Sequence, residues 1–345
     1  MHDMGANPLS YTWTLTKMRI RLAMRNRAFF FFSLVMPLLF LLGAVLFVGR
    51  GTTQWVGYIF GTILCTTVMG SFWGLSVQLV TFREQGILRR FRLAPMGPEP
   101  MLASSILSNY FLVLPVAFFE LLVCRWAFHM QSWGNLWAIF LLVTIGSATF
   151  SALGLVVASV TNTMQETQMI NNLIWMGFLF LSGATIPLAS FPPWLQRVAL
   201  FIPAQYLATG LQSAATRLTT TFELFEDVVA LSLGLFVAFE ISRQLFRWEP
   251  EAKVPRSAKY WVLAALVPFL VFGAWENATG KRLSHVHQNF DLLRSGFAQR
   301  TPPRIETLRR ERVAPSGSLN PLSGDLHRNG HRKLRRNQHA GCDRF

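Results

Sequence analysis

The 345-residue chain is 52% hydrophobic and only 14% charged, with 30 Phe and 11 Trp. This composition excludes an ordinary soluble domain of the same length and indicates a protein solvated by lipid. A formal net charge of +15 would suit nucleic acid, but the basic residues gather in short loops beside apolar runs and in the carboxyl-terminal tail. That distribution is typical of membrane topology signals, so no nucleic-acid partner is expected.

The first residues predict a helix at the membrane interface and then a span. Helical periodicity over residues 1–27 separates an apolar stripe from a basic one: Tyr11, Leu15, Met18 and Leu22 against Lys17, Arg21 and Arg25. This cytoplasmic amphipathic helix would be either a plain anchor or a lever between the membrane and a cytoplasmic partner. Residues 28–48 carry no charge and are long enough to cross a hydrocarbon core of about 30 Å.

Further apolar runs predict the rest of the bundle. They are Trp55–Val80, Met101–Val123, Leu136–Val160, Met169–Ala189 and Val228–Phe246. The expected fold is therefore all-α, a polytopic membrane protein with a six-helix transmembrane bundle over residues 28–248. Gly57, Gly61, Gly70 and Gly74 in the second span favour close helix packing. Prolines within residues 182–215 predict short outer re-entrant helices, one of them starting near Pro193.

Basic residues in the loops predict the topology. On one side of the membrane, the segments 1–27, 82–99 and 247–259 hold thirteen Lys and Arg, whereas the loops on the other side hold four. The amino terminus is therefore expected in the cytoplasm. Residues 249–276 contain a linker and a candidate seventh span, Tyr260–Trp275, whose crossing the sequence leaves open. Residues 277–345 are expected to form a basic, disordered tail.

Few ionisable residues fall inside the predicted spans. Glu120 lies near the outer end of the third span, where it could reach lipid headgroups, and Glu240 and Arg243 are spaced to neutralise each other. Such scarcity argues against a proton- or sodium-coupled transporter. A membrane-embedded lipid enzyme is also disfavoured, since no nucleophilic, acid-base or metal-binding constellation is present.

The most informative segment lies between the second and third spans, from Phe82 to Pro95. As a helix it gathers Ile87, Leu88 and Phe91 on one face and leaves its arginines outside that face. The residues alone allow two interpretations. The segment is either a solvated loop with topogenic arginines or an amphipathic helix whose apolar ridge fills a groove on a soluble partner.

This segment resembles the membrane subunits of type-2 ABC exporters, which carry an Arg-Glu-x-Gly-x-Leu-x-x-hydrophobic-x-x-x-Pro stretch at this place. The likeness covers about residues 10–248. In that family the stretch contributes the coupling helix that docks into the ATPase subunit. The resemblance thus implies an ATPase-docking site here: Arg83, Glu84, Gly86, Leu88, Arg89, Arg90, Phe91 and Pro95.

The resemblance further implies a permease subunit of an ATP-driven exporter in the plasma (inner) membrane. The chain has no G-x-x-x-x-G-K-[ST] loop, so it is expected to be no enzyme and to bind no cofactor, with ATP and Mg held by a separate ABC ATPase subunit. Two copies, or this chain and a homologous permease, would form a dimer. The alternative is a non-transporting membrane-anchor or accessory protein whose basic tail binds lipid or nucleic acid.

A substrate path would follow the dimer axis, lined by the second and fifth spans. Four polar residues are its candidate lining: Asn171, Asn172, Ser182 and Thr185. Hydrogen bonding between helices is an equally open role for them. No metal site is expected, and the exported substrate is not specified by the sequence.

Overall fold

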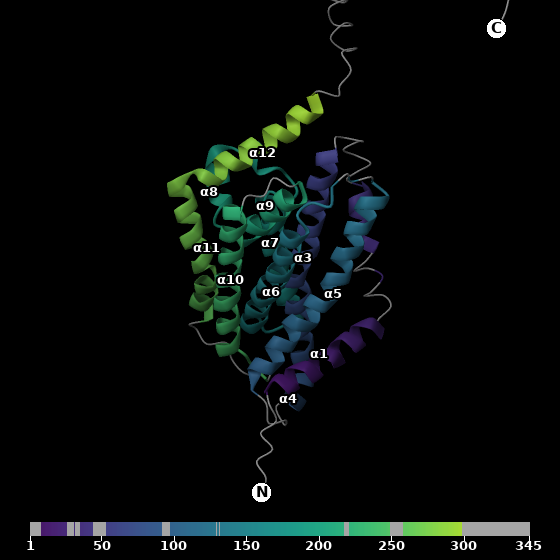
Figure 1. Ribbon diagram of the computed structural model, residues 1–345. Helices are drawn as coiled ribbons and strands as arrows, with labels where there is room; N and C mark the ends of the chain where they lie inside the picture. The colour runs from purple at the N-terminus through teal and green to yellow at the C-terminus, as the bar shows by residue number, and fades with distance from the viewer. Residues whose placement is uncertain are drawn as a thin grey trace, which may run out of the picture. The chain divides into compact units, whose positions relative to one another are not determined.

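The computed structural model describes residues 8–25, 31, 35–43, 53–91, 97–128, 130, 132–216, 221–248 and 258–298. Within these residues the regular structure is helical and contains no strand, which confirms the predicted all-α membrane protein. The long helices form a bundle (Figure 1): α3 (Thr53–Glu84), α5 (Pro98–Trp126), α6 (Leu136–Val160), α7 (Met164–Leu181), α10 (Thr221–Gln244) and α11 (Ala258–Thr279).

Several of these helices match the predicted spans. Among the described residues, three helices are long and apolar enough on their own to cross a bilayer: Val56–Glu84, Pro98–Trp126 and Leu136–Val160. They correspond to the second, third and fourth predicted spans. Of the predicted first span, residues 28–48, the structure describes residue 31 and residues 35–43, which are helical, and the rest lies outside the described residues.

The fifth predicted span differs from α7 at both ends. The helix starts earlier than predicted, because the Thr163 side chain caps it by accepting a hydrogen bond from Glu166 N at 3.1 Å. It also stops earlier, at Leu181, just before Gly183, whose φ of 80° cannot continue a helix. Helix α7 is thus shifted towards the amino terminus relative to the apolar run.

Helices α3 and α6 form the centre of the bundle, and α6 is the most enclosed of the three apolar spans. Phe72 of α3 and Phe150 of α6 both pack edge-on against Phe178 of α7, each with ring centroids 5.5 Å apart. This aromatic cluster holds the fifth span against the two central helices, because edge-to-face pairs add to the free energy of apolar packing.

The glycines of the second span have two different environments. A Cβ at Gly61 would lie 2.7 Å from Gln212 Cα, so α3 and α9 (Pro203–Thr216) touch backbone to backbone there. Gly57 lies similarly close to Ala215. Gly70 and Gly74 instead face open space, with nothing within 4 Å of a Cβ. Only the first two glycines therefore serve close packing within this chain.

Short helices follow the fifth span, as predicted. They are η1 (Leu188–Ser190), α8 (Pro193–Ala199) and α9. Pro193 stands in the first turn of α8, where its missing N–H costs no hydrogen bond. Pro203 begins α9, and α9 is almost wholly buried against α3, α6 and α10.

The carboxyl-terminal prediction of disorder was wrong for part of the tail. Helix α11 continues to Thr279, and α12 (Lys281–Ala298) follows after Gly280, whose φ is 65°. The two helices meet at an angle of 74°. Order arises here because Arg282 is buried in the bundle, which the basic composition of the segment does not reveal. Residues 299–345 of the predicted tail lie outside the described residues.

Changing Gly61 to Ala should destabilise the bundle. The added Cβ would press on the α9 backbone, and overpacking of this kind costs about 1–3 kcal/mol. The measurement is the midpoint of thermal unfolding in detergent. Gly74→Ala is the matched control on the same helix, and it should leave the midpoint unchanged or raise it slightly, because its Cβ meets no atom. Equal effects of the two changes would contradict the α3–α9 contact.

Candidate functional site

A tight turn joins α3 to the short helix α4 (Ile87–Phe91) at one end of the bundle (Figure 1). The turn consists of Gln85 and Gly86, and Gly86 N donates a hydrogen bond to Arg83 O at 3.0 Å. Gly86 has a φ of 67°, in the left-handed region that glycine adopts without a steric penalty. The glycine of the predicted motif is therefore required by the backbone geometry that redirects the chain into α4.

Helix α4 directs its side chains differently from the sequence prediction. Leu88 is fully buried in its own chain, in an apolar cluster that includes Leu15, Leu79 and Leu102. Arg89 and Arg90 are exposed, and Ile87 and Phe91 are half-buried. Leu88 therefore fastens α4 to the bundle in this structure and is not part of a ridge offered to a partner. The surface presented to solvent is basic. Pro95 lies outside the described residues.

Arg83 ties the end of α3 to the end of α6. The residue is 1% exposed, and its guanidinium donates hydrogen bonds to Ala158 O at 2.9 Å and to Thr161 O at 2.6 Å. The last carbonyls of a helix have no partner within the helix and carry a partial negative charge. Arg83 thus satisfies these carbonyls, and they in turn compensate for the burial of its charge.

The neighbouring residue Glu84 ties the same helix to the start of α7. Its Oε1 accepts a hydrogen bond from Met164 N at 2.7 Å, where the helix dipole favours a negative charge. A third residue, Arg247, follows α10 and donates to Thr161 O at 2.7 Å and to Asn162 Oδ1 at 3.2 Å. We call residues 161–164, between α6 and α7, the α6–α7 corner. Charged side chains from the end of α3 and from the segment after α10 hold this corner.

Helix α1 (Pro8–Arg25) packs on α5 and lies at the same end of the bundle as α4 (Figure 1). Arg19 donates to Gln78 Oε1 at 3.3 Å, and its guanidinium lies 5.5 Å from the centre of the Phe82 ring. Burial lowers the pKa of Arg19 to about 10, so the side chain keeps its charge at neutral pH. The face of α1 that contacts the bundle contains Leu15 and Arg19, whereas Met18 and Leu22 are exposed.

The four predicted path residues fall into two groups. Asn171 is buried and donates to Ser76 Oγ of α3 at 2.6 Å, and the buried Ser182 Oγ accepts from Ala184 N at 3.2 Å. Asn172 is exposed on α7. Thr185 is also exposed, and it donates to Leu179 O at 3.0 Å. Asn171 thus makes the helix-to-helix hydrogen bond of the alternative interpretation, whereas the bonds of Ser182 and Thr185 stay within the end of α7 and the segment that follows it.

Sequence reasoning misplaced Glu120 and gave no specific role to Arg247. Glu120 is fully buried rather than near headgroups, and its Oε1 accepts from Thr67 Oγ1 of α3 at 2.6 Å. In the sequence, Arg247 contributed only to the count of basic residues that predicts the topology. Nothing in the sequence pairs it with residues 161 and 162, which lie some 85 positions earlier. The expected pairing of Glu240 with Arg243 is present at 2.6 Å, and Arg243 also contacts Glu99.

Residues 10–215, more than half of the chain, match the family described as ABC-2 type transporter. The linearmycin resistance permease protein LnrN of Bacillus subtilis is 25% identical over 173 residues, which cover 50% of this chain and 43% of that protein. The putative transport permease YvfS of the same species is 23% identical over 54% of this chain and 78% of its own length.

A yeast protein is also similar over part of its length. The ABC transporter ATP-binding protein/permease PDR18 of Saccharomyces cerevisiae is 23% identical over 46% of this chain, but the match covers only 12% of that protein. The chain therefore matches less than half of the length of the linearmycin and yeast relatives. The α4 turn and the α6–α7 corner both fall inside the family match.

Removing the Arg83 side chain should loosen the α6–α7 corner. Arg83→Ala gives up two charge-assisted hydrogen bonds, each worth about 1.5–3 kcal/mol, and leaves two carbonyls without this partner. We expect a clear loss of thermal stability, of roughly 3 kcal/mol or more, measured by unfolding in detergent. Arg89→Ala is the matched control six residues later, and its exposed side chain predicts almost no change. Unchanged thermal stability of Arg83→Ala would show that the guanidinium does not anchor the corner.

Proposed function

Because the chain belongs to the ABC-2 type transporter family, whose members are membrane transport permeases, we propose that it is the permease subunit of an ATP-driven exporter. A separate ABC ATPase subunit would bind ATP and Mg and dock on α4. The observation that carries this proposal is the position of Arg83 and Glu84. They fix the end of α3 to the α6–α7 corner directly before a turn that presents Arg89 and Arg90 to solvent.

The contacts support a route for coupling through the bundle. A force on α4 would reach α3 directly through the turn at Gly86, and α6 and α7 through Arg83 and Glu84. Arg247 would bring the end of α10 along, because it bonds the same corner. Closure of the ATPase dimer would thereby move the ends of four helices together. The ATPase must contact α4 differently in its two states for ATP to shift this equilibrium.

The basic surface of α4 suits an acidic groove on the ATPase. Arginine is favoured for such contacts because its planar guanidinium binds carboxylates in a bidentate manner. Leu88 would serve this docking indirectly, by holding α4 against Leu15 of α1 and Leu102 of α5. The amino-terminal helix α1 would then lie beside the docked ATPase, with the amino terminus in the cytoplasm.

A second copy or a homologous permease would pack along α3 and α7. Trp73 of α3 and Trp175 of α7 meet edge-on at 6.4 Å. On α3, Gly70 and Gly74 leave open space, as close helix approach in lipid requires. Leu173 of α7 is 77% exposed. The exposed Asn172 and Thr185 would contribute polar groups to a path between the two copies, and Asn171 and Ser182 would stay within each bundle.

Linearmycin is the first substrate to test, since one relative is named as a linearmycin resistance permease. The test co-expresses the chain with an ABC ATPase encoded beside it. Co-purification, ATP turnover and survival on linearmycin are then measured. An ATPase that copurifies and turns over ATP faster with the chain than alone is the expected result. The absence of any complex would contradict the proposal, whereas survival alone reports on the substrate.

Reversing the charge of α4 should uncouple the permease from its ATPase without unfolding it. In Arg89→Glu, Arg90→Glu we expect at least about a tenfold loss of co-purified ATPase, which corresponds to roughly 1.4 kcal/mol of binding free energy. Both side chains are exposed, so thermal stability should not change. Arg197→Glu is the control, because Arg197 is also exposed but lies on α8. Wild-type complex formation by the α4 variant would contradict docking at this surface.

A further inference from the structure

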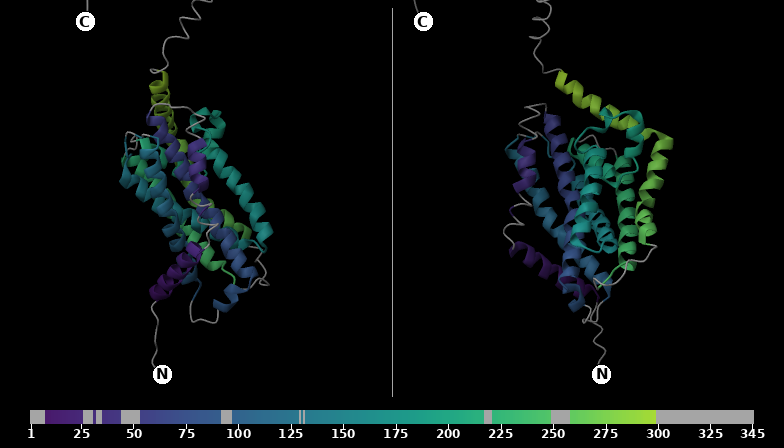
Figure 2. Two further views of the ribbon diagram at one scale, coloured as in Figure 1. Left: turned by 90° about the vertical axis from the view of Figure 1, so that its right-hand side faces the viewer. Right: turned by 180° about the vertical axis from the view of Figure 1, so that it is seen from behind.

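The segment α11–α12 lies beyond the part of the chain that matches the transporter family, which ends at residue 215. Both views in Figure 2 place α12 at the end of the bundle opposite α1 and α4. Helix α11 packs against α10 and α6 on its way to that end. Its role is therefore independent of the coupling site and requires its own explanation.

Helix α11 has the features of a helix that crosses the membrane beside α10. Phe269 is fully buried, and a Cβ at Gly234 of α10 would lie 2.2 Å from its ring, so the two helices pack closely. The opposite face is exposed and apolar, with Val271 62% exposed. Tyr260 near one end and Trp275 near the other are also exposed, and such aromatic residues are enriched at the two interfaces of a bilayer.

A buried charge network joins the start of α12 to the bundle. Arg282 is 6% exposed, and its guanidinium forms ion pairs with Asp227 of α10 and, at 3.5 Å, with Glu276 of α11. It also donates to Thr209 Oγ1 of α9 at 2.6 Å, and it lies over the Tyr206 ring at 4.6 Å from the ring centre. One side chain of α12 therefore contacts three other helices.

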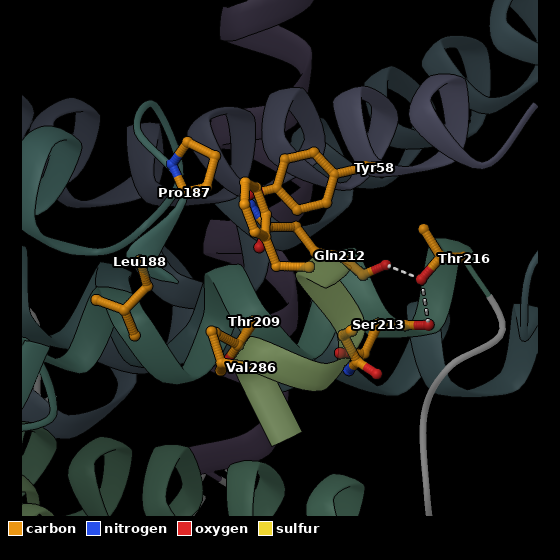
Figure 3. Close-up of a pocket in the computed structure, with 10 residues that line it drawn as sticks. Tyr58, Pro187, Leu188, Thr209, Gln212, Ser213, Thr216 and Val286 are labelled. Carbon is orange, nitrogen blue, oxygen red and sulfur yellow. Dashed lines mark hydrogen bonds between the residues drawn. The ribbon is translucent and has the colours of Figure 1, made fainter. Parts of the chain in front are cut away.

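Beneath α12 lies a small cavity at the end of α3 and α9. Figure 3 shows Tyr58 of α3, Leu188 of η1, Gln212 of α9 and Val286 of α12 around it. Its volume is about 50 Å³. One water needs about 10–15 Å³ of such volume, and ligand pockets have roughly 300–1,000 Å³, so the cavity has room for a few waters and not for a substrate. A second pocket of about 20 Å³ lies between Asp227 and His285.

We propose that α12 is a lid over the outer end of the translocation path, and that Arg282 is the positioning residue that latches it closed. The proposal rests on the function proposed above, which places α4 in the cytoplasm and the path along α3 and α7. Helix α12 contacts η1, which follows α7, and its Val286 lines the same cavity as Tyr58 of α3. It therefore lies beside η1 and beside the first turns of α3.

The latch is suited to opening as a unit. Gly280 has a φ of 65° and nothing within 4 Å of a Cβ, so it provides a hinge between α11 and α12. In the first turn of α12, Arg282 makes polar contacts with α9, α10 and α11. When the lid opens, the guanidinium can exchange its buried partners for water at the membrane surface.

The side of the membrane is tested first, by labelling intact cells with a membrane-impermeant maleimide. In cells that express the chain without the ATPase, which would cover α4, Gln288→Cys on the exposed face of α12 should be labelled, and Arg90→Cys on α4 should be labelled only after permeabilisation. Cys342 is replaced by Ser, whereas Cys65 and Cys124 are buried and can stay. Protection of Gln288→Cys in intact cells would overturn the lid. Labelling of Arg90→Cys there would instead overturn the orientation in the proposed function.

Lid movement is tested with Ser213→Cys, which lines both cavities beneath α12. We expect its labelling rate to rise at least tenfold when the complex is trapped with ATP, and also without ATP when Arg282→Ala is added. Arg282→Lys, which keeps the charge, should restore most of the protection. Arg243→Ala removes an exposed ion pair on α10 and serves as the control. A labelling rate that does not respond to ATP in an active complex would show that α12 is a static cap.

A cross-link tests the lid without relying on a variant that weakens the fold. Val286 and Ser213 line the same cavity, so a bifunctional thiol reagent with a reducible spacer should join the pair Val286→Cys, Ser213→Cys. We expect the cross-linked complex to lose linearmycin export and to recover it on reduction. Where linearmycin is not exported, ATP turnover is measured instead. Full activity of the cross-linked complex would overturn the proposal. Inactivity of the unmodified complex would instead contradict the proposed function.

Discussion

The burial of the Arg83 guanidinium is the constraint on which the cytoplasmic end of the proposed transporter depends. A charge that is 1% exposed is tolerated only where fixed dipoles replace its water, and the carbonyls at the end of α6 do so. Those carbonyls also need a hydrogen-bond donor, so the desolvation cost of the guanidinium and that of the carbonyls offset each other. At the start of α7, the Glu84 carboxylate accepts a hydrogen bond from a free backbone N–H. The dipeptide Arg83-Glu84 therefore joins α3, α6 and α7.

A second buried arginine organises the opposite end, but with different partners. Arg83 binds backbone carbonyls, which keep their dipoles under all conditions, whereas Arg282 binds the side chains of Asp227 and Glu276. Backbone carbonyls are fixed by the helix, and side chains can change rotamer and reach water. The contacts near α4 are therefore rigid, and those of α12 can be released. This difference fits a transporter in which the ATPase acts on the α4 end and the path opens at the α12 end.

The sequence predicted the spans better than it predicted what their residues contact. Apolar runs fixed three spans to within a few residues, since length and hydropathy are local properties. The family resemblance placed Leu88 in the docking surface, and the structure buries it within its own chain. Helical periodicity could not reveal this, because it shows which residues share a face and not what that face contacts. Helix α12 was missed because a basic composition indicates disorder unless a buried acid compensates for it, and Asp227 lies 55 residues earlier.

Taken by itself, the sequence determined the membrane class, the place of the α4 turn and the family resemblance, all of which follow from patterns within short windows. Only the tertiary structure decided that Arg83 and Glu84 face the α6–α7 corner, that Asn171 bonds Ser76, and that α12 covers the far end of the bundle. The physical reason is that a buried polar group needs a partner, and the chain supplies that partner from positions far away in sequence.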